Sequence, residues 1–279
     1  MEYDLINKYL KINYYLIDMA TRIIEFEKPK LRNPIFIEGL PGVGNVGRVA
    51  AGYLIEELKA KKFAELISSH FMPIVLIPQG SQVEMIKAEF FYWKAKEENQ
   101  SDLIIMIGDS QSTNPEGHYE IVEEILKFLK KLNVREIFAL GGLNIGVPTE
   151  KPKVVGAVND PSLEKKYRKY NIVFESSQRV GSIVGAAGLF VGLAKYYDIP
   201  ATCLLGETSG MPFLPDPKSA EAVIKVLSEI LNLKIDTSRL QERIKEMKEF
   251  MKRVEAMQSQ LLQPPVSPVA EKEKLTYIG

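Results

Sequence analysis

The sequence predicts an α/β fold in which a mainly parallel sheet is sandwiched by helices, with an antiparallel hairpin insert and a C-terminal helical extension. Three observations carry this prediction. From residue 33 the chain alternates short β-branched runs with segments whose apolar residues recur at helical spacing. Gly80 lies between two strand-like segments and can take the positive φ that a tight hairpin connection needs. After Gly210 the remaining periodic segments are helical.

The expected strands are short, and a turn or a helix separates each from the next. They cover residues 21–26, 33–38, 63–68, 73–78, 82–94, 102–108, 135–140, 152–159, 171–176 and 201–207. The expected helices cover residues 46–61, 118–132, about 161–169, 183–196, 218–231 and 237–262. Asp216 or Ser219 is expected to cap the helix that begins near Lys218. In the second hairpin strand, Glu89, Phe91 and Trp93 alternate with Phe90 and Tyr92, which indicates a core lid or an interface patch.

The chain divides into an N-terminal extension (1–22), a single α/β domain (23–262) that includes the C-terminal helices (218–262), and a flexible C-terminal tail (263–279). The last predicted helix carries apolar residues in an alternating four-three step, which is typical of a coiled-coil seam. We therefore expect an oligomer interface there, with a helix packed on its own domain as an equally open alternative. The seam residues are Leu240, Ile244, Met247, Met251 and Val254.

Composition excludes several classes of protein and site. The chain has 279 residues, with 36 basic and 36 acidic side chains, and this balance argues against a nucleic-acid binder. Its single cysteine, Cys203, excludes internal disulfides and thiolate zinc sites, and its two histidines make a metal site improbable. The longest apolar run, residues 182–194, is too short for a membrane span. We expect a cytoplasmic protein that holds no metal or cofactor.

Two glycine-rich segments are the candidate ligand loops. Gly42, Gly44 and Gly47 form a GxGxxG pattern between a strand and a helix, where backbone amides can cradle a phosphate. A dinucleotide site also requires an acidic residue at the end of the second strand, and here that strand ends in Ser-Ser-His. Close helix-to-sheet packing is therefore the favoured interpretation. Gly141 and Gly142 begin a second segment that we expect to end its strand, where α/β sheets bind ligands.

Catalytic patterns are sparse, and we expect no enzyme. Asp109, Ser110 and His118 lack a nucleophile elbow, so Asp109 is interpreted as a loop hydrogen-bonding residue and His118 as a surface residue. Glu207 ends a strand and is either a general base or, as we favour, the cap of the next turn. Cys203 is expected to be inert core. Glycines 181, 185, 188 and 192 step along one face of a predicted helix, which indicates close approach of another backbone.

Several segments together resemble archaeal homologues of the proteasome assembly chaperone. They are GLPGVGNVG, GGLNIG, GSIVGAAGLFVGLA, ATCLLGETSG and PDPKSAEAV, in that order, within about residues 23–262. The resemblance implies a phosphorylase/hydrolase-like α/β fold without demonstrated catalysis. It also implies self-association, alone or with a related chain, and a role in assembling proteasome α-subunits into rings.

The resemblance extends to the chain end, with one departure. Family members that engage the proteasome end with a hydrophobic residue, tyrosine and any residue. Here the end is Leu275, Thr276, Tyr277, Ile278 and Gly279, so the tyrosine is displaced by one position. A proline-containing spacer, residues 263–269, would give the tail reach. The leading hypothesis is an oligomeric, non-enzymatic chaperone that binds α-subunits through this tail. The alternative is a nucleoside- or phosphate-binding protein or enzyme that uses the glycine loops and Glu207.

Overall fold

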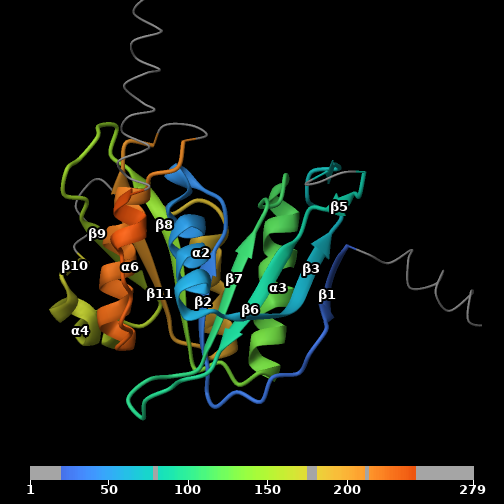
Figure 1. Ribbon diagram of the computed structural model, residues 1–279, viewed down its shortest axis with the longest axis horizontal. Helices are drawn as coiled ribbons and strands as arrows, with labels where there is room; N and C mark the ends of the chain where they lie inside the picture. Colours follow the sequence, from blue (N-terminus) through green and yellow to red (C-terminus); the bar gives the residue numbers. More distant parts are fainter. Residues whose placement is uncertain (1–19, 78–80, 175–180, 211–213, 243–279) are drawn as a thin grey trace, which may run out of the picture.

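A mixed sheet of nine strands forms the centre of the computed structural model, which describes residues 20–77, 81–174, 181–210 and 214–242 (Figure 1). The strands lie in the order β1 (Thr21–Glu25), β3 (Lys61–Ser68), β6 (Ala88–Trp93), β7 (Leu103–Gly108), β2 (Ile35–Gly39), β8 (Glu136–Asn144), β11 (Ala201–Thr208), β9 (Val154–Val158) and β10 (Ile172–Val173). Helices flank the sheet, so the predicted α/β fold is confirmed.

The middle of the sheet is parallel. β7, β2, β8 and β11 are consecutive parallel neighbours, and Ile37 of β2 aligns with Ile105 of β7 and Phe138 of β8. β6, β3 and β1 continue the sheet on one side in antiparallel pairs, and β9 pairs antiparallel with β11 on the other. Because the four central strands point the same way, their carboxyl ends meet at one edge of the sheet, where α/β sheets usually bind ligands.

Helices cover both faces of the sheet and enclose two cores. α2 (Val46–Leu58) and α6 (Pro217–Leu231) pack side by side on one face, and α3 (Pro115–Lys131) and α5 (Ala186–Ala194) pack together on the other. β2 serves both cores by alternation, since Phe36 faces α3 and α5 while Ile35 and Ile37 face α2 and α6. The smaller helical elements include α4 (Pro161–Tyr167) and the 3-10 helices η1 (Val43–Asn45), η2 (Arg168–Tyr170) and η3 (Lys195–Tyr197).

Three helices begin with the same sequence pattern, a capping residue followed by proline. Asn114, Asp160 and Asp216 are the N-caps of α3, α4 and α6, and each is followed by a proline at the first helical position. The side chain of each cap accepts a hydrogen bond from a backbone N–H of the first turn, while proline has no N–H left to satisfy there. Asp216 is therefore the cap of α6, and Ser219 is fully buried inside the helix.

The predicted hairpin insert is shorter than expected. The segment 88–94 is not part of it, because β6 lies between β3 and β7 in the main sheet. Phe90 and Trp93 are consequently core residues, and the aromatic strand is neither a lid nor an exposed patch. The insert is the separate two-stranded sheet of β4 (Val75–Leu76) and β5 (Glu84–Met85).

The glycine-marked helix also begins later than predicted. α5 starts at Ala186, so Gly181 lies outside it and Gly185 precedes it with a φ of 92°, a conformation that favours glycine. The four glycines therefore do not share one helix face. Within α5, a Cβ at Gly188 would approach Ile183 of the same chain, and a Cβ at Gly192 would meet no atom within 4 Å.

The burial of Leu240 contradicts the prediction that this residue lies in an oligomer interface. Residues 238–242 are helical, and Leu240 is fully buried in the core beneath α2 and α6. Thr237 and Gln241 both donate hydrogen bonds to Glu221 of α6, which fixes this segment against the chain's own domain. Ile244, Met247, Met251, Val254 and the tail residues 263–279 lie outside the described residues. Thr21 and Arg22, which the prediction put in the N-terminal extension, are the first residues of β1.

Among the described residues, no helix combines the length and the hydropathy that a membrane span requires.

The closest approach between α2 and the sheet yields a prediction about stability. A Cβ at Gly47 would lie 2.2 Å from the carbonyl oxygen of Leu140 in β8, so Gly47→Ala must push the helix off the strand. We expect a loss of about 1–3 kcal/mol in the free energy of unfolding, measured by denaturant titration. Gly52 lies on the same helix with no atom within 4 Å of its Cβ direction, so Gly52→Ala is the matched control and should gain up to about 1 kcal/mol. Equal effects of the two substitutions would contradict the packing argument.

Candidate functional site

The first predicted ligand loop, residues 40–45, is occupied by contacts within the chain. Gly44 has a φ of 60°, and a Cβ there would lie 2.8 Å from the hydroxyl of Thr208 at the end of β11. Its carbonyl oxygen accepts a hydrogen bond of 2.7 Å from the backbone N–H of Asp216. A Cβ at Gly142 would lie 2.2 Å from the carbonyl oxygen of Val43. The glycines therefore let the loop pack directly on β8, β11 and the start of α6.

Gly42 and Gly47 fit the same interpretation. Gly42 has an extended backbone with a φ of −167°, and Gly47 lies in the first turn of α2 against Leu140. The GxGxxG pattern thus serves close helix-to-sheet packing, as the favoured interpretation predicted, and this contact gives no support to phosphate binding.

The second predicted loop is part of a strand. β8 runs through Asn144, so Gly141 and Gly142 are strand residues that pair with Leu205 and Gly206 of β11, and the expectation that they follow the strand is wrong. Glu207 also has a different role from the predicted turn cap. Its carboxylate accepts a hydrogen bond of 3.0 Å from the backbone N–H of Lys153, and its own N–H donates to the Lys153 carbonyl. Glu207 thereby fixes the residue that precedes β9.

Gln111 connects the loops at the carboxyl edge, although no sequence pattern distinguishes it. It follows β7, and its Nε2 donates a hydrogen bond of 2.6 Å to the Pro41 carbonyl after β2. Its Oε1 accepts from the backbone N–H of Ala186 at the start of α5, at 3.0 Å, and lies 3.2 Å from Nε2 of His118. His118 lies at a helix start, as predicted, but it is half-buried and its Nδ1 lies 2.9 Å from the Asn114 carbonyl.

Asp109, Ser110 and His118 do not form the catalytic set of a serine hydrolase. Ser110 donates its hydroxyl hydrogen to the carbonyl of Gln111 at 2.7 Å, rather than facing His118. Asp109 accepts from the backbone N–H of Lys87 at 3.2 Å and forms an ion pair of 3.6 Å with Arg48, which confirms it as a loop hydrogen-bonding residue. Beside Gln111 and His118, an apolar cavity of about 10 Å³ has room for about one water molecule and not for a nucleoside.

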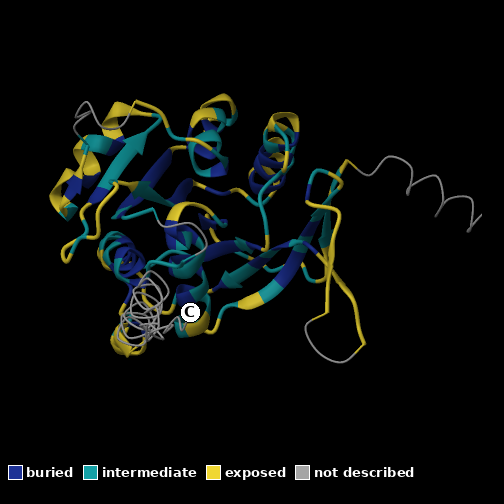
Figure 2. Ribbon diagram, turned by 90° about the horizontal axis from the view of Figure 1, so that it is seen from above, coloured by how far each residue is buried: buried dark blue, intermediate teal, exposed yellow. Residues whose placement is uncertain are grey.

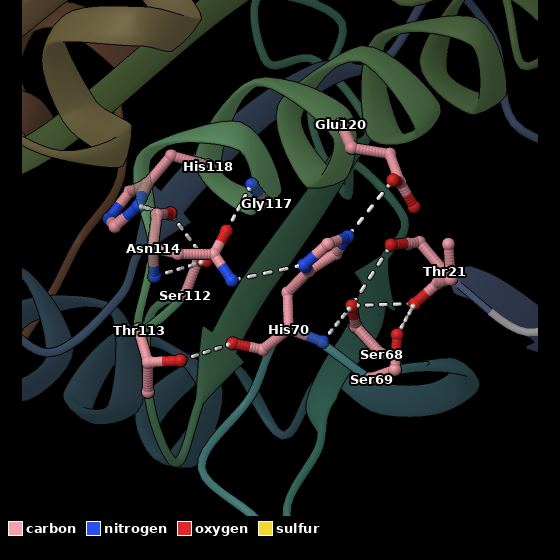
Figure 3. A network of polar contacts seen from close by, with 11 residues as sticks. Thr21, Ser68, Ser69, His70, Ser112, Thr113, Asn114, Gly117, His118 and Glu120 are labelled. Carbon is pink, nitrogen blue, oxygen red and sulfur yellow. Dashed lines mark hydrogen bonds and ion pairs between the residues drawn. The ribbon is translucent and has the colours of Figure 1, made fainter.

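A second polar cluster ties the start of α3 to the end of β3 (Figure 3). Asn114 caps α3 by accepting from the backbone N–H of Gly117 at 2.7 Å, and its Nδ2 lies 3.3 Å from Nδ1 of His70. The other ring nitrogen of His70 lies 3.0 Å from Glu120 of α3. The backbone N–H of Thr113 donates to the His70 carbonyl at 2.9 Å. These bonds hold the chain in place immediately before the β4–β5 insert.

Glu38 is the one described acidic residue in this region whose chemistry is strongly perturbed. It lies on β2 with a side chain only 1% exposed, and one carboxylate oxygen accepts from the Leu40 N–H at 2.8 Å. The other oxygen has no hydrogen-bond partner among the described residues. Burial raises the pKa of Glu38 to about 7, and backbone hydrogen bonds from Leu40 and Leu140 only partly oppose this rise.

The position of Glu38 separates it from a catalytic acid. Carboxyl groups with a pKa near neutrality are common in active sites, but they face substrate there. Glu38 instead faces the α3 and α5 core and the buried Cys203. Burial, together with the negative field of Glu38, raises the pKa of the Cys203 thiol, as expected for an inert core cysteine. A lone acidic residue inside the apolar run Ile35–Gly39 was the sequence signal for Glu38.

Within the described part of the chain, no cluster of three or more histidine, cysteine, aspartate or glutamate side chains could hold a metal ion.

Glu38 predicts a specific dependence of stability on pH. Its pKa is about 7 in the folded chain and near 4.5 in the unfolded chain, so the folded state holds the proton more tightly. The stability from Glu38 is therefore complete below about pH 4.5 and is lost as pH rises to about 7, by roughly 3 kcal/mol. Glu38→Gln should remove this part of the pH profile in denaturant unfolding between pH 4.5 and 8.

The exposed Glu116 provides a matched control, since Glu116→Gln changes the net charge equally. Parallel pH profiles for wild type and Glu38→Gln would contradict the prediction.

Known proteins similar to this chain identify its family. The sequence model of the PAC2 family matches residues 36–255. An uncharacterized protein of Methanocaldococcus jannaschii, MJ1210, is 35% identical over 265 residues, which covers 95% of this chain and 99% of that protein.

Two solved structures from Pyrococcus furiosus have the same fold. PbaB, described as an archaeal proteasome activator, is 42% identical with a TM-score of 0.81, and the match covers 85% of this chain and 99% of PbaB. PbaA, described as an archaeal homolog of proteasome-assembly chaperone, is 28% identical with a TM-score of 0.68 over 86% of this chain and 99% of PbaA. The family match spans most of the sheet and its helices, and we conclude that this chain belongs to the PAC2 family.

Proposed function

We propose that this protein is a non-enzymatic, oligomeric partner of the proteasome that binds α-subunits partly through its C-terminal tail. The observation that carries the proposal is the 42% identity to PbaB, an archaeal proteasome activator, over 99% of that chain. The similarity to PbaA, a homolog of a proteasome-assembly chaperone, points to the same class of partner. A cytoplasmic location and self-association, alone or with a related chain, belong to the same proposal.

The carboxyl edge of the sheet supports a role without catalysis. Gln111, Asp109 and Glu207 all bond to backbone groups of neighbouring loops. The glycine loop packs on Thr208 and Gly142, and the cavity beside Gln111 is about 10 Å³. The groups that a nucleoside or phosphate site would need at this edge are therefore already bonded or packed within the chain. Protein surfaces outside this edge are therefore the better candidates for function.

The tail supplies the proposed contact with the proteasome. Residues 275–279 carry an aromatic side chain, and the spacer 263–269 contains three prolines. Proline-rich spacers are semi-rigid and extended, so they hold a short motif away from the body. Several tails on one oligomer would bind with increased avidity because each bound tail raises the effective concentration of the others.

Binding to isolated α-rings tests the proposal, with native mass spectrometry or co-sedimentation as the measurement. Intact protein should bind, and a variant lacking residues 264–279 should bind roughly tenfold more weakly or not at all, because avidity through the tails is lost. Removal of Gly279 alone is the matched control, since it makes Tyr277 the penultimate residue. That variant should bind at least as well as the intact chain.

The outcomes separate the two parts of the proposal. If the intact protein and the Gly279 deletion both fail to bind, the proteasome is not the partner. Equal binding by intact and tail-less protein would show that another surface is the anchor.

A further inference from the structure

The β4–β5 insert exposes more apolar surface than any function described above requires. We call the described residues 72–77 and 81–85 the arm. Figure 2 shows the arm projecting from the body as an exposed ribbon. Its most exposed large apolar residues are Ile77 and Val83, each 63% exposed, and Met85, 59% exposed. The other exposed apolar side chains of the arm are Met72, Ile74, Val75 and Leu76. Contiguous apolar surface of this kind marks a site of interaction.

The arm is anchored firmly at both roots. Phe71, immediately before it, and Ile86, immediately after it, are each only 6% exposed and belong to the α3 and α5 core. The His70 carbonyl accepts from Thr113, and the backbone N–H of Lys87 donates to Asp109. A fixed arm loses little conformational freedom when it binds, so its apolar surface contributes efficiently to affinity.

A two-stranded ribbon with both faces exposed is marginally stable by itself in water. Among the described residues, β5 pairs with β4 along one edge and no strand pairs with its other edge. The free edge of β4 is a poor partner, because Pro73 lacks an N–H group and the N–H of Ile74 donates to the Met72 carbonyl. The β5 edge contains no proline and is the edge open to another strand.

The charge of the arm indicates what that strand belongs to. No charged residue occurs from Phe71 through Val83, in a chain where 26% of residues are charged. The first charge is Glu84, which forms an ion pair of 2.9 Å with Lys87 of the same root. A neutral apolar surface offers nothing to select a charged partner, and it is complementary to an identical copy of itself.

We propose that the arm binds the same arm of a second copy of this chain, with the two β5 edges antiparallel across a twofold axis. The ribbon then becomes four-stranded, and its apolar side chains are covered by those of the partner. This inference rests on the self-association in the proposed function and gives it a location other than the predicted seam at Leu240.

Cross-linking of the full-length chain tests the contact directly. The single native cysteine, Cys203, is buried and its thiol pKa is raised, so an introduced cysteine is the only reactive one expected among the described residues. Facing residues of paired strands have Cβ atoms about 5 Å apart. Val83→Cys and Met85→Cys should therefore give covalent dimers with a short bismaleimide. Val184→Cys, at a site 93% exposed outside the arm, is the matched control and should stay monomeric on a denaturing gel.

A charge variant tests the same contact in solution. Val83→Lys combined with Met85→Lys places charges at two exposed positions, where they cannot disturb the core but must oppose arm pairing. For this double variant of the full-length protein, sedimentation analysis should show the mass of the oligomer falling to about half or less. Val184→Lys should leave the mass of the oligomer unchanged.

Other results would overturn the inference in distinguishable ways. A monomeric wild type would remove self-association from the proposed function as well as the arm contact. An oligomer that neither cross-links at the arm nor responds to the two lysines would place self-association elsewhere. Loss of α-subunit binding with an intact oligomer would show that the arm faces the proteasome.

Discussion

The whole carboxyl edge depends on direct backbone contact between the glycine loop and the central strands. Any side chain at Gly47 or Gly142 would collide with a carbonyl oxygen of β8 or of the loop at 2.2 Å. Because neither residue has a side chain, α2 lies close to the sheet and the loop closes over the ends of β8 and β11. Gln111 completes the closure through its bonds to Pro41 and Ala186. An edge that commonly forms a ligand crevice in α/β proteins is thus occupied by the chain's own atoms.

Closure of this edge changes where function can be located. Buried groups with perturbed chemistry remain inside the body, as Glu38 and Cys203 show, but they face the core. An unpartnered carboxylate oxygen in such a position reduces stability at neutral pH. Natural chains keep such groups when a site or a specific fold requires them, and here the carboxylate bonds the end of β2 at Leu40. Among the described residues, the exposed apolar side chains of the arm are then the better candidates for partner recognition.

Much of the fold could be predicted from the sequence, because local patterns determine it. The apolar runs predicted β2, β7, β8 and β11, and the capping residue before Pro217 predicted the start of α6. The errors occurred where long-range contacts decide the structure. β6 looked like one half of a hairpin, yet it pairs with β7, and Gly141 looked like a strand end, yet β8 continues through pairing with β11. Gln111 had no local signal, since its role is defined by contacts with the loop after β2, with His118 of α3 and with the start of α5.

The predicted seam and the arm are both apolar in sequence, but they differ in burial in the structure. Leu240 belongs to a heptad-like series, but Glu221 holds its segment against α6 and the side chain is fully covered. The arm has no such covering in the described chain, although its roots at Phe71 and Ile86 are buried in the core. A rigid root beneath an exposed apolar ribbon is costly for an isolated monomer, because the ribbon neither folds back nor gains cover. That cost is offset when the ribbon is covered by another molecule, and a ribbon with one open edge and no charge from Phe71 through Val83 is suited to cover by its own copy.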